Sequence, residues 1–327
     1  MAAKTASGDR PDIIIAARGA TPGQPTRSPF GERDEIGMLN LVTPESAGRI
    51  LAEVDLHRVF DLSVDFHVGM PAWTAWGDPP FTFWMTATPA GGVNDDVTGF
   101  GAEAMRNVSR SSDAFSMFAH LGTHVDTLNH IGIDGVVWNC FNHHEHLGSQ
   151  RWLVAGAEKL PPVIARGVLI DVAAAHGVDV LPDHYAIDGA ELARVLAKQG
   201  TELRAGDVVL VRTGRMSYWP DAERYLPGEP GPDLDGATFL AEAGAIMVGA
   251  DNVGLEYHPA AFTEEPFQPV HQYLLASAGV PIMESVNLEE IAAARVYEFA
   301  FIGACMPIRG ATGAPMRPLA LPLRRSS

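Results

Sequence analysis

Cysteine, positive charge and long apolar runs are scarce in this chain of 327 residues. Only Cys140 and Cys305 are present, which excludes a disulfide framework and a cysteine-type zinc site and predicts two reduced, buried thiols. Lys and Arg number 23 against 40 Asp and Glu, a net charge of -17, so the sequence predicts no nucleic-acid partner and no anionic membrane partner. There is no 18-residue apolar run and no signal-peptide pattern, so a soluble cytoplasmic protein is expected.

Several sequence motifs of enzyme classes are also missing. The Gly-x-Ser-x-Gly pattern of serine hydrolases is absent, and neither cysteine has the local context of a nucleophile. No Walker or dinucleotide-binding fingerprint follows an expected strand, so no nucleotide cofactor is implied. A water activated by a metal is therefore the better candidate nucleophile.

The composition is that of a globular protein. Hydrophobic residues make up 46% of the chain and charged residues 19%, enough apolar material for a sizeable core. Residues 1–30 are rich in Ala, Gly, Pro, Ser and Thr and are predicted to form a flexible N-terminal arm. Residues 31–327 are predicted to form one mixed α/β domain, because helical and strand patterns alternate there.

Local signals place several helices and strands. Thr43-Pro44 is typical of an N-cap followed by a first-turn proline and predicts a helix to about residue 54. Capping-box spacing predicts helices over 189–199, after Asp188, and over 288–295, after Asn287. Short apolar runs rich in β-branched residues predict buried strands at 166–172, 207–212, 245–249 and 297–303.

The segment from His120 to His130 reads His-x-Gly-Thr-His-x-Asp-x-x-x-His and brings three imidazoles and one carboxylate into eleven residues. Imidazole suits zinc, manganese or iron, and carboxylate oxygen suits manganese or magnesium. A mixture without thiolate favours a hydrolytic metal over a structural one. The segment therefore predicts a metal-assisted hydrolase.

Neither a regular helix nor a straight strand gathers these side chains. In a helix, Asp126 leaves the face that His120 and His124 share, and in a straight strand the two histidines lie roughly 13 Å apart. A backbone bend at Gly122 removes the difficulty. Thr123–Thr127 can then run extended, with His124 and Asp126 side by side.

The segment resembles the signature of the cyclase family of metal-dependent hydrolases, which includes bacterial kynurenine formamidase, isatin hydrolase and a metal-dependent dienelactone hydrolase. Further stretches resemble family patterns, occur in the same order along the chain and together cover most of residues 30–310. They are Asp-Glu-Ile-Gly-Met-Leu-Asn at 34–40, Gly-Met-Pro-Ala-Trp at 69–73, Asp-Val-Val-Leu-Val-Arg-Thr-Gly at 207–214 and Gly-Ala-Asp-Asn at 249–252. The family's second metal-binding segment is similar to the stretch that contains His271, Leu274, Leu275, Gly279 and Glu284, with a spacing one residue longer than the commonest pattern.

The resemblance implies a swivelling β/β/α fold with a central barrel-like mixed sheet. It implies one or two divalent ions, Zn²⁺ or Mn²⁺, held by His120, His124, Asp126, His271 and Glu284. It also implies that His130 is the acid-base residue and that Trp73, in the family's Met-Pro-x-Trp pattern, lies against the substrate. A homodimer or homotetramer is expected from the family.

The expected reaction is hydrolysis of a C–N bond other than a peptide bond, in an aryl formamide or cyclic amide that is a small aromatic or cyclic molecule. A lactone hydrolase is an alternative, because the same metal and base would serve an ester carbonyl. A metal-dependent lyase or dehydratase and a metal-binding protein without activity are two further hypotheses.

Two other groups of residues are interpreted as structural. His143, His144 and His146 with Glu145 are expected in a solvated loop, because adjacent histidines point in different directions and Asn and Gly flank them. Core packing is the favoured role for any single ring of the aromatic-rich stretch Trp73, Trp76, Phe81, Phe83 and Trp84. Within that stretch, only Trp73 is assigned to the substrate.

Overall fold

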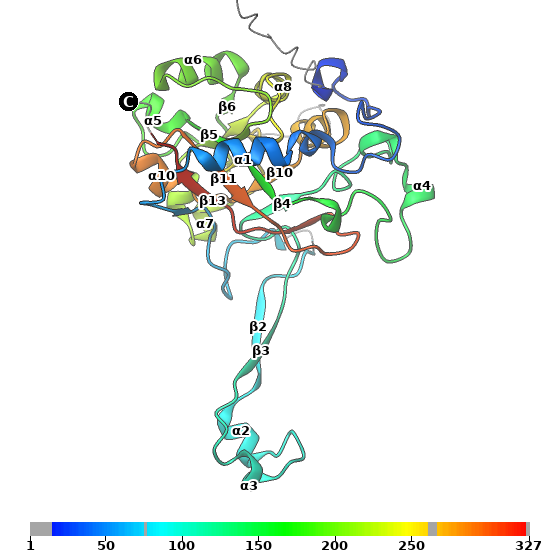
Figure 1. Ribbon diagram of the computed structural model, residues 1–327, viewed down its shortest axis with the longest axis vertical. Coiled ribbons are helices and arrows are strands. Elements are labelled where there is room, and N and C mark those ends of the chain that lie inside the picture. The colour runs from blue at the N-terminus through cyan, green and yellow to red at the C-terminus, as the bar shows by residue number, and fades with distance from the viewer. Residues whose placement is uncertain (1–14, 75–76, 261–266, 325–327) are drawn as a thin grey trace, which may run out of the picture.

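The computed structural model describes residues 15–74, 77–260 and 267–324. The body of the molecule is built on a nine-stranded mixed sheet with the order β1-β13-β11-β5-β7-β9-β10-β4-β12 (Figure 1). Its strands are β1 (Phe60–Asp61), β4 (His124–Asp126), β5 (Val163–Asp171), β7 (Val208–Arg212), β9 (Met247–Ala250), β10 (Ile282–Glu284), β11 (Glu298–Gly303), β12 (Gly313–Pro315) and β13 (Leu319–Pro322).

The centre of this sheet is parallel, and its strands are the apolar runs that the sequence predicts. β5, β7, β9 and β10 pair in parallel, and every residue of Val208–Arg212 is buried. Strands buried on both faces need continuous apolar sequence and connections that cross over the sheet. The connecting helices include α5 (Val172–His176), α6 (Gly189–Gln199), α8 (Leu234–Glu242) and α9 (Pro269–His271), which continues as a π-helical turn, η7 (Gln272–Ser277).

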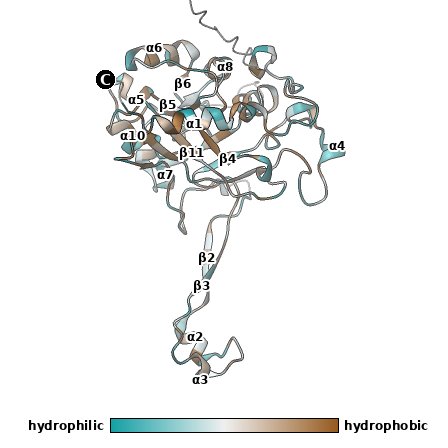
Figure 2. Cartoon of the chain, viewed as in Figure 1, coloured by the Kyte–Doolittle hydropathy of each residue, from teal (hydrophilic) through white to brown (hydrophobic). Residues whose placement is uncertain are grey.

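Antiparallel strands flank the parallel centre. On one side β11 pairs with β5 and β13, and β13 pairs with β1. On the other side β4 lies between β10 and β12 and runs antiparallel to both. Hydrophobic residues gather on the strands of the body (Figure 2). Helix α1 (Pro44–Ala52) packs through Ile50 against Ala300 of β11 and Leu321 of β13.

Shorter elements complete the body. β6 (Ala186–Ile187) and β8 (Gly231–Pro232) form a small parallel sheet. The remaining helical turns of the body are η1 (Ala16–Gly19), η2 (Gly37–Leu41), η4 (Trp138–Cys140), α4 (His143–His146), η5 (Ala157–Lys159), η6 (Arg215–Tyr218), α7 (Ala222–Tyr225) and α10 (Glu289–Ala293). The expectation of a loop at residues 143–146 is therefore wrong in conformation, because the Asn142 side chain caps this turn by accepting from the backbone N–H of Glu145 at 3.0 Å.

Two of the three predicted helix starts are confirmed. Thr43 caps α1 and Asp188 caps α6, each through a side-chain oxygen that accepts a backbone N–H three residues on. The third is wrong, because helix α10 has Leu288 as its N-cap and no capping side chain. Asn287 lies one residue too early and accepts only the N–H of Glu289, at 3.3 Å.

The described part of the N-terminal segment packs on the body. Ile15, Ala16 and Ala17 are buried in the main core. Farther along, the Ser277 hydroxyl donates to the carbonyl of Gln24 at 2.7 Å. Residues 1–14, the rest of the predicted flexible arm, lie outside the described residues.

A long hairpin, residues 82–116, extends away from the body (Figure 1). We call it the projecting hairpin. Its stem is the antiparallel pair β2 (Thr82–Ala87) and β3 (Ser112–Ser116), and its far end carries α2 (Pro89–Asn94) and α3 (Ala102–Met105). No pattern in the sequence predicts this hairpin.

The projecting hairpin corrects the expectation for the aromatic-rich stretch. Phe81 is buried at its root, as expected for core packing. Phe83 and Trp84 are 47% and 49% exposed, because within the described part of the chain β2 pairs only with β3 and no other layer covers it. Core packing is therefore wrong for these two rings, and Trp76 lies outside the described residues.

Candidate metal centre

A backbone bend at Gly122 shapes the His120–His130 segment, as the spacing predicts. Gly122 has φ of +57°, a left-handed conformation that glycine adopts at little cost. The chain then enters β4, where His124 and Asp126 lie two residues apart on the same face of the sheet. Strand pairing places Glu284 of β10 directly opposite His124.

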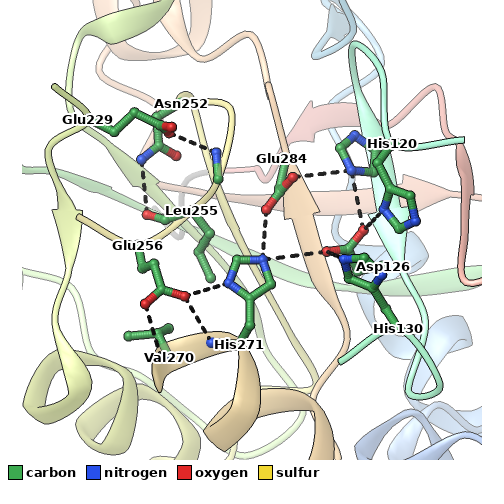
Figure 3. Close-up of polar contacts among 12 residues, drawn as sticks. His120, Asp126, His130, Glu229, Asn252, Leu255, Glu256, Val270, His271 and Glu284 are labelled. Atoms are coloured by element: carbon green, nitrogen blue, oxygen red, sulfur yellow. Dashed lines mark hydrogen bonds and ion pairs between the residues drawn. The ribbon is translucent and has the colours of Figure 1, made fainter. Parts of the chain in front are cut away.

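These residues meet in one buried polar cluster (Figure 3). Nε2 of His124 lies 3.2 Å from a carboxylate oxygen of Asp126 and 3.2 Å from one of Glu284. Nε2 of His271 lies 3.0 Å from Glu284 and 3.6 Å from Asp126. The structure therefore brings together residues from β4, β10 and helix α9 that are up to 160 positions apart in sequence, from 124 to 284.

His120 joins the cluster from the turn before β4. Its Nδ1 lies 2.5 Å from Oδ1 of Asp126, and its Nε2 lies 2.9 Å from the hydroxyl of Thr312. The neighbouring Gly313 leaves room for this ring, because a Cβ there would lie 2.5 Å from Cε1 of His120. All five residues for which metal binding is predicted thus converge.

The cluster has the features of a site for divalent cations. Two groups of side chains have ligand atoms within 4.8 Å of one another, His120 with His124 and Asp126, and Asp126 with His271 and Glu284. Nε2 of His124 and Oδ2 of Asp126 are buried without a hydrogen-bond partner. Buried polar atoms are rarely left unpartnered, and imidazole and carboxylate are ligands that zinc and manganese accept. The residues therefore fit one ion or two, with Asp126 shared.

The electrostatics of the cluster also favour a cation. Burial lowers the pKa of His124, but the carboxylates of Asp126 and Glu284, each 3.2 Å from its Nε2, outweigh burial and raise it to about 10. Burial raises the pKa of Asp126, yet its interactions with the surrounding imidazoles of His130, His120 and His124 bring it well below its usual range. These carboxylates are ionised, and they attract positive charge to the space between the imidazoles.

His130 lies beside this cluster, not inside it. Its ring stacks on His120 with centroids 4.0 Å apart, and its Nε2 is 3.8 Å from Asp126. Burial, together with the charge of His120, lowers the pKa of His130 to about 3. The imidazole is thus neutral at neutral pH and has a nitrogen lone pair that can accept a proton.

A pocket of about 490 Å³ opens onto the cluster. His120, His130, His271 and Glu284 form part of its lining. Most of its other walls are apolar and aromatic, from Trp73, Phe118, Ile131, Val253, Tyr257, Pro259, Phe267 and Pro269. Trp73 therefore lines this pocket, whose volume and mostly apolar lining suit a small molecule.

Glu256, which the sequence does not predict as a site residue, contacts His271. Its carboxylate accepts from Nδ1 of His271 at 2.5 Å, from the backbone N–H of His271 at 3.1 Å and from that of Val270 at 3.2 Å (Figure 3). A carboxylate on one imidazole nitrogen fixes the tautomer, so that the other nitrogen faces the metal position. No short motif links residues 256 and 271, so only the fold identifies this role.

Glu229 and His258 form a second pair near the pocket that was not predicted. Glu229 is fully buried, and its carboxyl group accepts from the backbone N–H of Gly254 at 2.7 Å. Nδ1 of His258, which lines the pocket, lies 3.6 Å from Glu229. Burial and the charge of Glu284 raise the pKa of Glu229 well above its usual range, which favours the protonated form of this carboxyl group.

The residues discounted from the sequence lie elsewhere. His143, His144 and His146 belong to none of the metal-binding groups found among the described residues. Cys140 and Cys305 are free, as predicted, but both are only half-buried. No helix in the described part of the chain is long and apolar enough to span a membrane.

Comparison with known proteins identifies the family. Residues 60–257, more than half of the chain, match the family model described as "Putative cyclase". The chain belongs to the cyclase family. The matched range contains the His120–His130 segment but ends before His271 and Glu284, which the structure brings to the same cluster. No curated protein matches the chain.

Solved structures confirm the cyclase fold. The crystal structure of a novel cyclase is 27% identical, with a TM-score of 0.81, and the match covers 93% of this chain and 100% of that chain. Isatin hydrolase A from Labrenzia aggregata, bound to benzyl benzoate, is 21% identical with a TM-score of 0.59, and the match covers 82% of this chain and 94% of that chain. A predicted metal-dependent hydrolase from Bacillus stearothermophilus is 19% identical with a TM-score of 0.51, and the match covers 81% of this chain and 98% of that chain.

Proposed function

We propose that this cyclase-family chain is a metal-dependent hydrolase that opens a C–N bond in an aryl formamide or cyclic amide. One observation carries the proposal: Nε2 of His124 and Oδ2 of Asp126 are buried and unpartnered at a cluster that opens into an apolar pocket. The neighbouring isatin hydrolase supports the choice of a cyclic amide as substrate.

The proposed cofactor is one Zn²⁺ or Mn²⁺ ion, or a pair of them. His120, His124 and Asp126 would hold one ion, and Asp126, His271 and Glu284 a second. A divalent ion at such a site lowers the pKa of a bound water toward 7 and polarises a carbonyl oxygen. Proton transfer and substrate positioning are proposed roles of the protein's own side chains.

His130 is the proposed general base. Its neutral imidazole faces the pocket beside Asp126, so it can take a proton from the attacking water and return it to the leaving nitrogen. Stacking on His120 holds the ring in place. Trp73 would pack against the flat ring of the substrate, and the apolar walls would exclude other water. The two free thiols fit the reducing cytoplasm proposed as its location.

The test is hydrolysis of N-formylkynurenine, isatin and a dienelactone by the purified protein, before and after chelation and metal restoration. The proposal expects chelator-sensitive turnover of one of the two amides. Turnover of the dienelactone alone would assign a lactone hydrolase, and an unsaturated product formed without water uptake would assign a lyase. Turnover that survives complete removal of metal would overturn the proposal.

A further inference from the structure

A second set of buried, unpartnered polar atoms lies beside the pocket, outside the metal centre. Among the described residues, seven buried side-chain atoms have no hydrogen-bond partner, and three of them belong to Glu229, Asn252 and His258. The structure ties these residues together. The Asn252 side chain donates to the carbonyl of Pro230 at 2.8 Å, and the backbone N–H of His258 donates to the carbonyl of Glu229 at 2.9 Å. Because buried polar groups are normally paired, three unpaired ones in one place indicate a functional role.

Gly254 leaves a gap between two of these groups. Gly254 and His258 both line the pocket. A Cβ on Gly254 would lie 3.4 Å from Oε1 of Glu229 and 3.6 Å from Nε2 of His258, and these are the two atoms that lack a partner. The same small space is therefore bordered by the backbone of the pocket wall and by two polar atoms, and a side chain at position 254 would fill it.

His258 has a carboxyl group on one side of its ring and the pocket on the other. Its Nδ1 lies 3.6 Å from Oε1 of Glu229, so Nε2 is the nitrogen left for a ligand. The His258 side chain is 28% exposed, whereas that of Glu229 is fully buried, so the imidazole has room to turn toward the pocket while the carboxyl group stays fixed. The ring of Trp73 lies 6.3 Å away and lines the same pocket. A substrate ring packed on Trp73 would therefore bring its substituents near His258.

We propose that His258 and Glu229 form a polar subsite that binds a hydroxyl substituent of the substrate, on the ring that packs against Trp73. This inference rests on the proposed function and adds a specificity determinant to it. A hydroxyl group donates one hydrogen bond and accepts others, so it can pair with the carboxyl group and the imidazole together. A substrate without this group would leave both of them unsatisfied, and a site built around a hydroxyl group rejects such a substrate strongly.

Charge and size both favour a hydroxyl group over an ionised substituent. Burial, with the charge of Glu284, raises the pKa of Glu229, and burial lowers the pKa of His258, so the neutral form of each group is favoured. A carboxylate or an ammonium group would lose its hydration here without gaining a full opposite charge. The gap accepts a Cβ at ordinary van der Waals distances, and a hydroxyl group has about the size of that methyl group.

The test compares the binding of phenol and toluene, which have the same shape and differ only in a hydroxyl and a methyl group. NMR titration of the purified, Zn²⁺-loaded protein gives both dissociation constants. The ratio of the Kd of toluene to that of phenol should fall about 10-fold or more in His258→Phe and in Gly254→Ala. The first variant removes the hydrogen-bonding nitrogen, and the second places a methyl group in the gap. In the wild type, the resonance of Nε2 of His258 should shift with phenol and not with toluene.

Two control variants make the same chemical changes away from the pocket. His57→Phe replaces an imidazole whose side chain is 97% exposed, and Gly48→Ala adds a methyl group where nothing lies within 4 Å. Both should keep the wild-type ratio. The metal content of every variant is measured as well. A contact between phenol and the ion is common to all of these proteins and therefore cancels when their ratios are compared.

The proposal is overturned by equal ratios in the wild type, His258→Phe and Gly254→Ala, or by a His258 resonance that phenol leaves unchanged. Partial unfolding of a variant cannot produce the expected result, because it lowers the binding of both ligands equally. Neither ligand has a bond that the enzyme could hydrolyse. A changed ratio in a protein without turnover would therefore reject the proposed hydrolase and keep the subsite, whereas hydrolysis with equal ratios would reject the subsite alone.

Discussion

The candidate metal centre and the projecting hairpin differ in what each leaves unsatisfied. In the centre, ionised carboxylates crowd around imidazoles, and Nε2 of His124 and Oδ2 of Asp126 have no partner although they are buried. In the hairpin, apolar rings such as Phe83 and Trp84 have no layer to cover them. A folded chain normally satisfies both kinds of group internally. The centre therefore points to a cation, whereas the hairpin exposes its apolar side chains on two described strands.

The two regions also differ in how the rest of the molecule depends on them. The side chains of the centre come from two strands, β4 and β10, from helix α9 and from the turn before β4, so a change there alters chemistry and packing together. Among the described residues, the hairpin extends away from the body and joins it at its two ends (Figure 1), so a change along it should leave the fold of the body unchanged. The predictions below use this difference, from the largest expected effect to the smallest.

The largest effects belong to the imidazoles of the centre, which the account divides into two roles. His124→Ala should empty the site, because it removes a ligand that two carboxylates face. His130→Ala should keep the metal and lower kcat by about 10² to 10⁴, the usual contribution of a general base. Metal analysis and turnover of both purified variants would check this, and loss of metal from His130→Ala would make His130 a ligand.

Glu256→Gln should weaken metal binding by about 10- to 100-fold without unfolding the chain. The amide keeps an acceptor for the two backbone N–H groups but removes the carboxylate that orients the His271 ring. A competition titration against a chromophoric chelator measures the affinity directly. The exposed Glu290→Gln is the control, and equal affinities in all three proteins would reject this positioning role.

Gly122→Ala should lower the free energy of unfolding by about 2 to 4 kcal/mol. This is the sum of the cost of a left-handed conformation for a residue with a Cβ and the cost of overpacking the site. A Cβ at Gly122 would lie 3.0 Å from both Met70 and Phe66. Gly23 also has a positive φ, +78°, but its Cβ would meet nothing within 4 Å, so Gly23→Ala should lose only about 1 kcal/mol. Denaturant unfolding of both variants separates the conformational cost from the steric one.

Glu229→Gln should change the pH dependence of stability. Burial, with the charge of Glu284, raises the pKa of Glu229 well above its usual range in the folded chain, so unfolding releases a proton. This acid therefore destabilises the fold progressively as pH rises above the unfolded value of 4.5, by up to about 1.4 kcal/mol per pH unit. At pH values below 4.5, the variant and the wild type should have similar free energies of unfolding. At higher pH, the variant should be the more stable of the two. Parallel stability curves from pH 4 to 7 would contradict this.

Trp84→Ala should have the smallest effect on the fold, within about 0.5 kcal/mol for the free energy of unfolding of the monomer, because a half-exposed ring on the hairpin supports no core. Leu128→Ala, in the fully buried core, should cost about 2 to 5 kcal/mol. Denaturation at concentrations where the chain is monomeric measures both. A loss for Trp84→Ala that matched Leu128→Ala would mean that the hairpin packs on its own body.

The sequence could predict the parts of the site that depend on short spacing. The His120–His130 segment, the bend at Gly122 and the buried strands follow from local periodicity and backbone rules, and the structure confirms them. His271 and Glu284 were assigned only through a family resemblance, because nothing local shows that helix α9 and strand β10 meet β4. Glu256 acts across the fold and leaves no local pattern.

The projecting hairpin could not be predicted for a different reason. Aromatic and β-branched residues near 81–84 favour a strand, but nothing in that pattern tells whether the strand enters a core or leaves it. Phe81 is buried, while Phe83 is 47% exposed two positions later on the same face. The exposed fraction rises between these two residues because the strand leaves the body at this point. Where a strand leaves the body depends on the tertiary arrangement and not on the local sequence.

The most direct test of the central claim is anomalous X-ray diffraction from crystals of the full chain grown with Zn²⁺ or Mn²⁺. The account predicts one or two strong peaks between His124, Asp126, His271 and Glu284, with Asp126 next to both if there are two. Saturated crystals with no peak among these residues, or with peaks only elsewhere on the molecule, would contradict it.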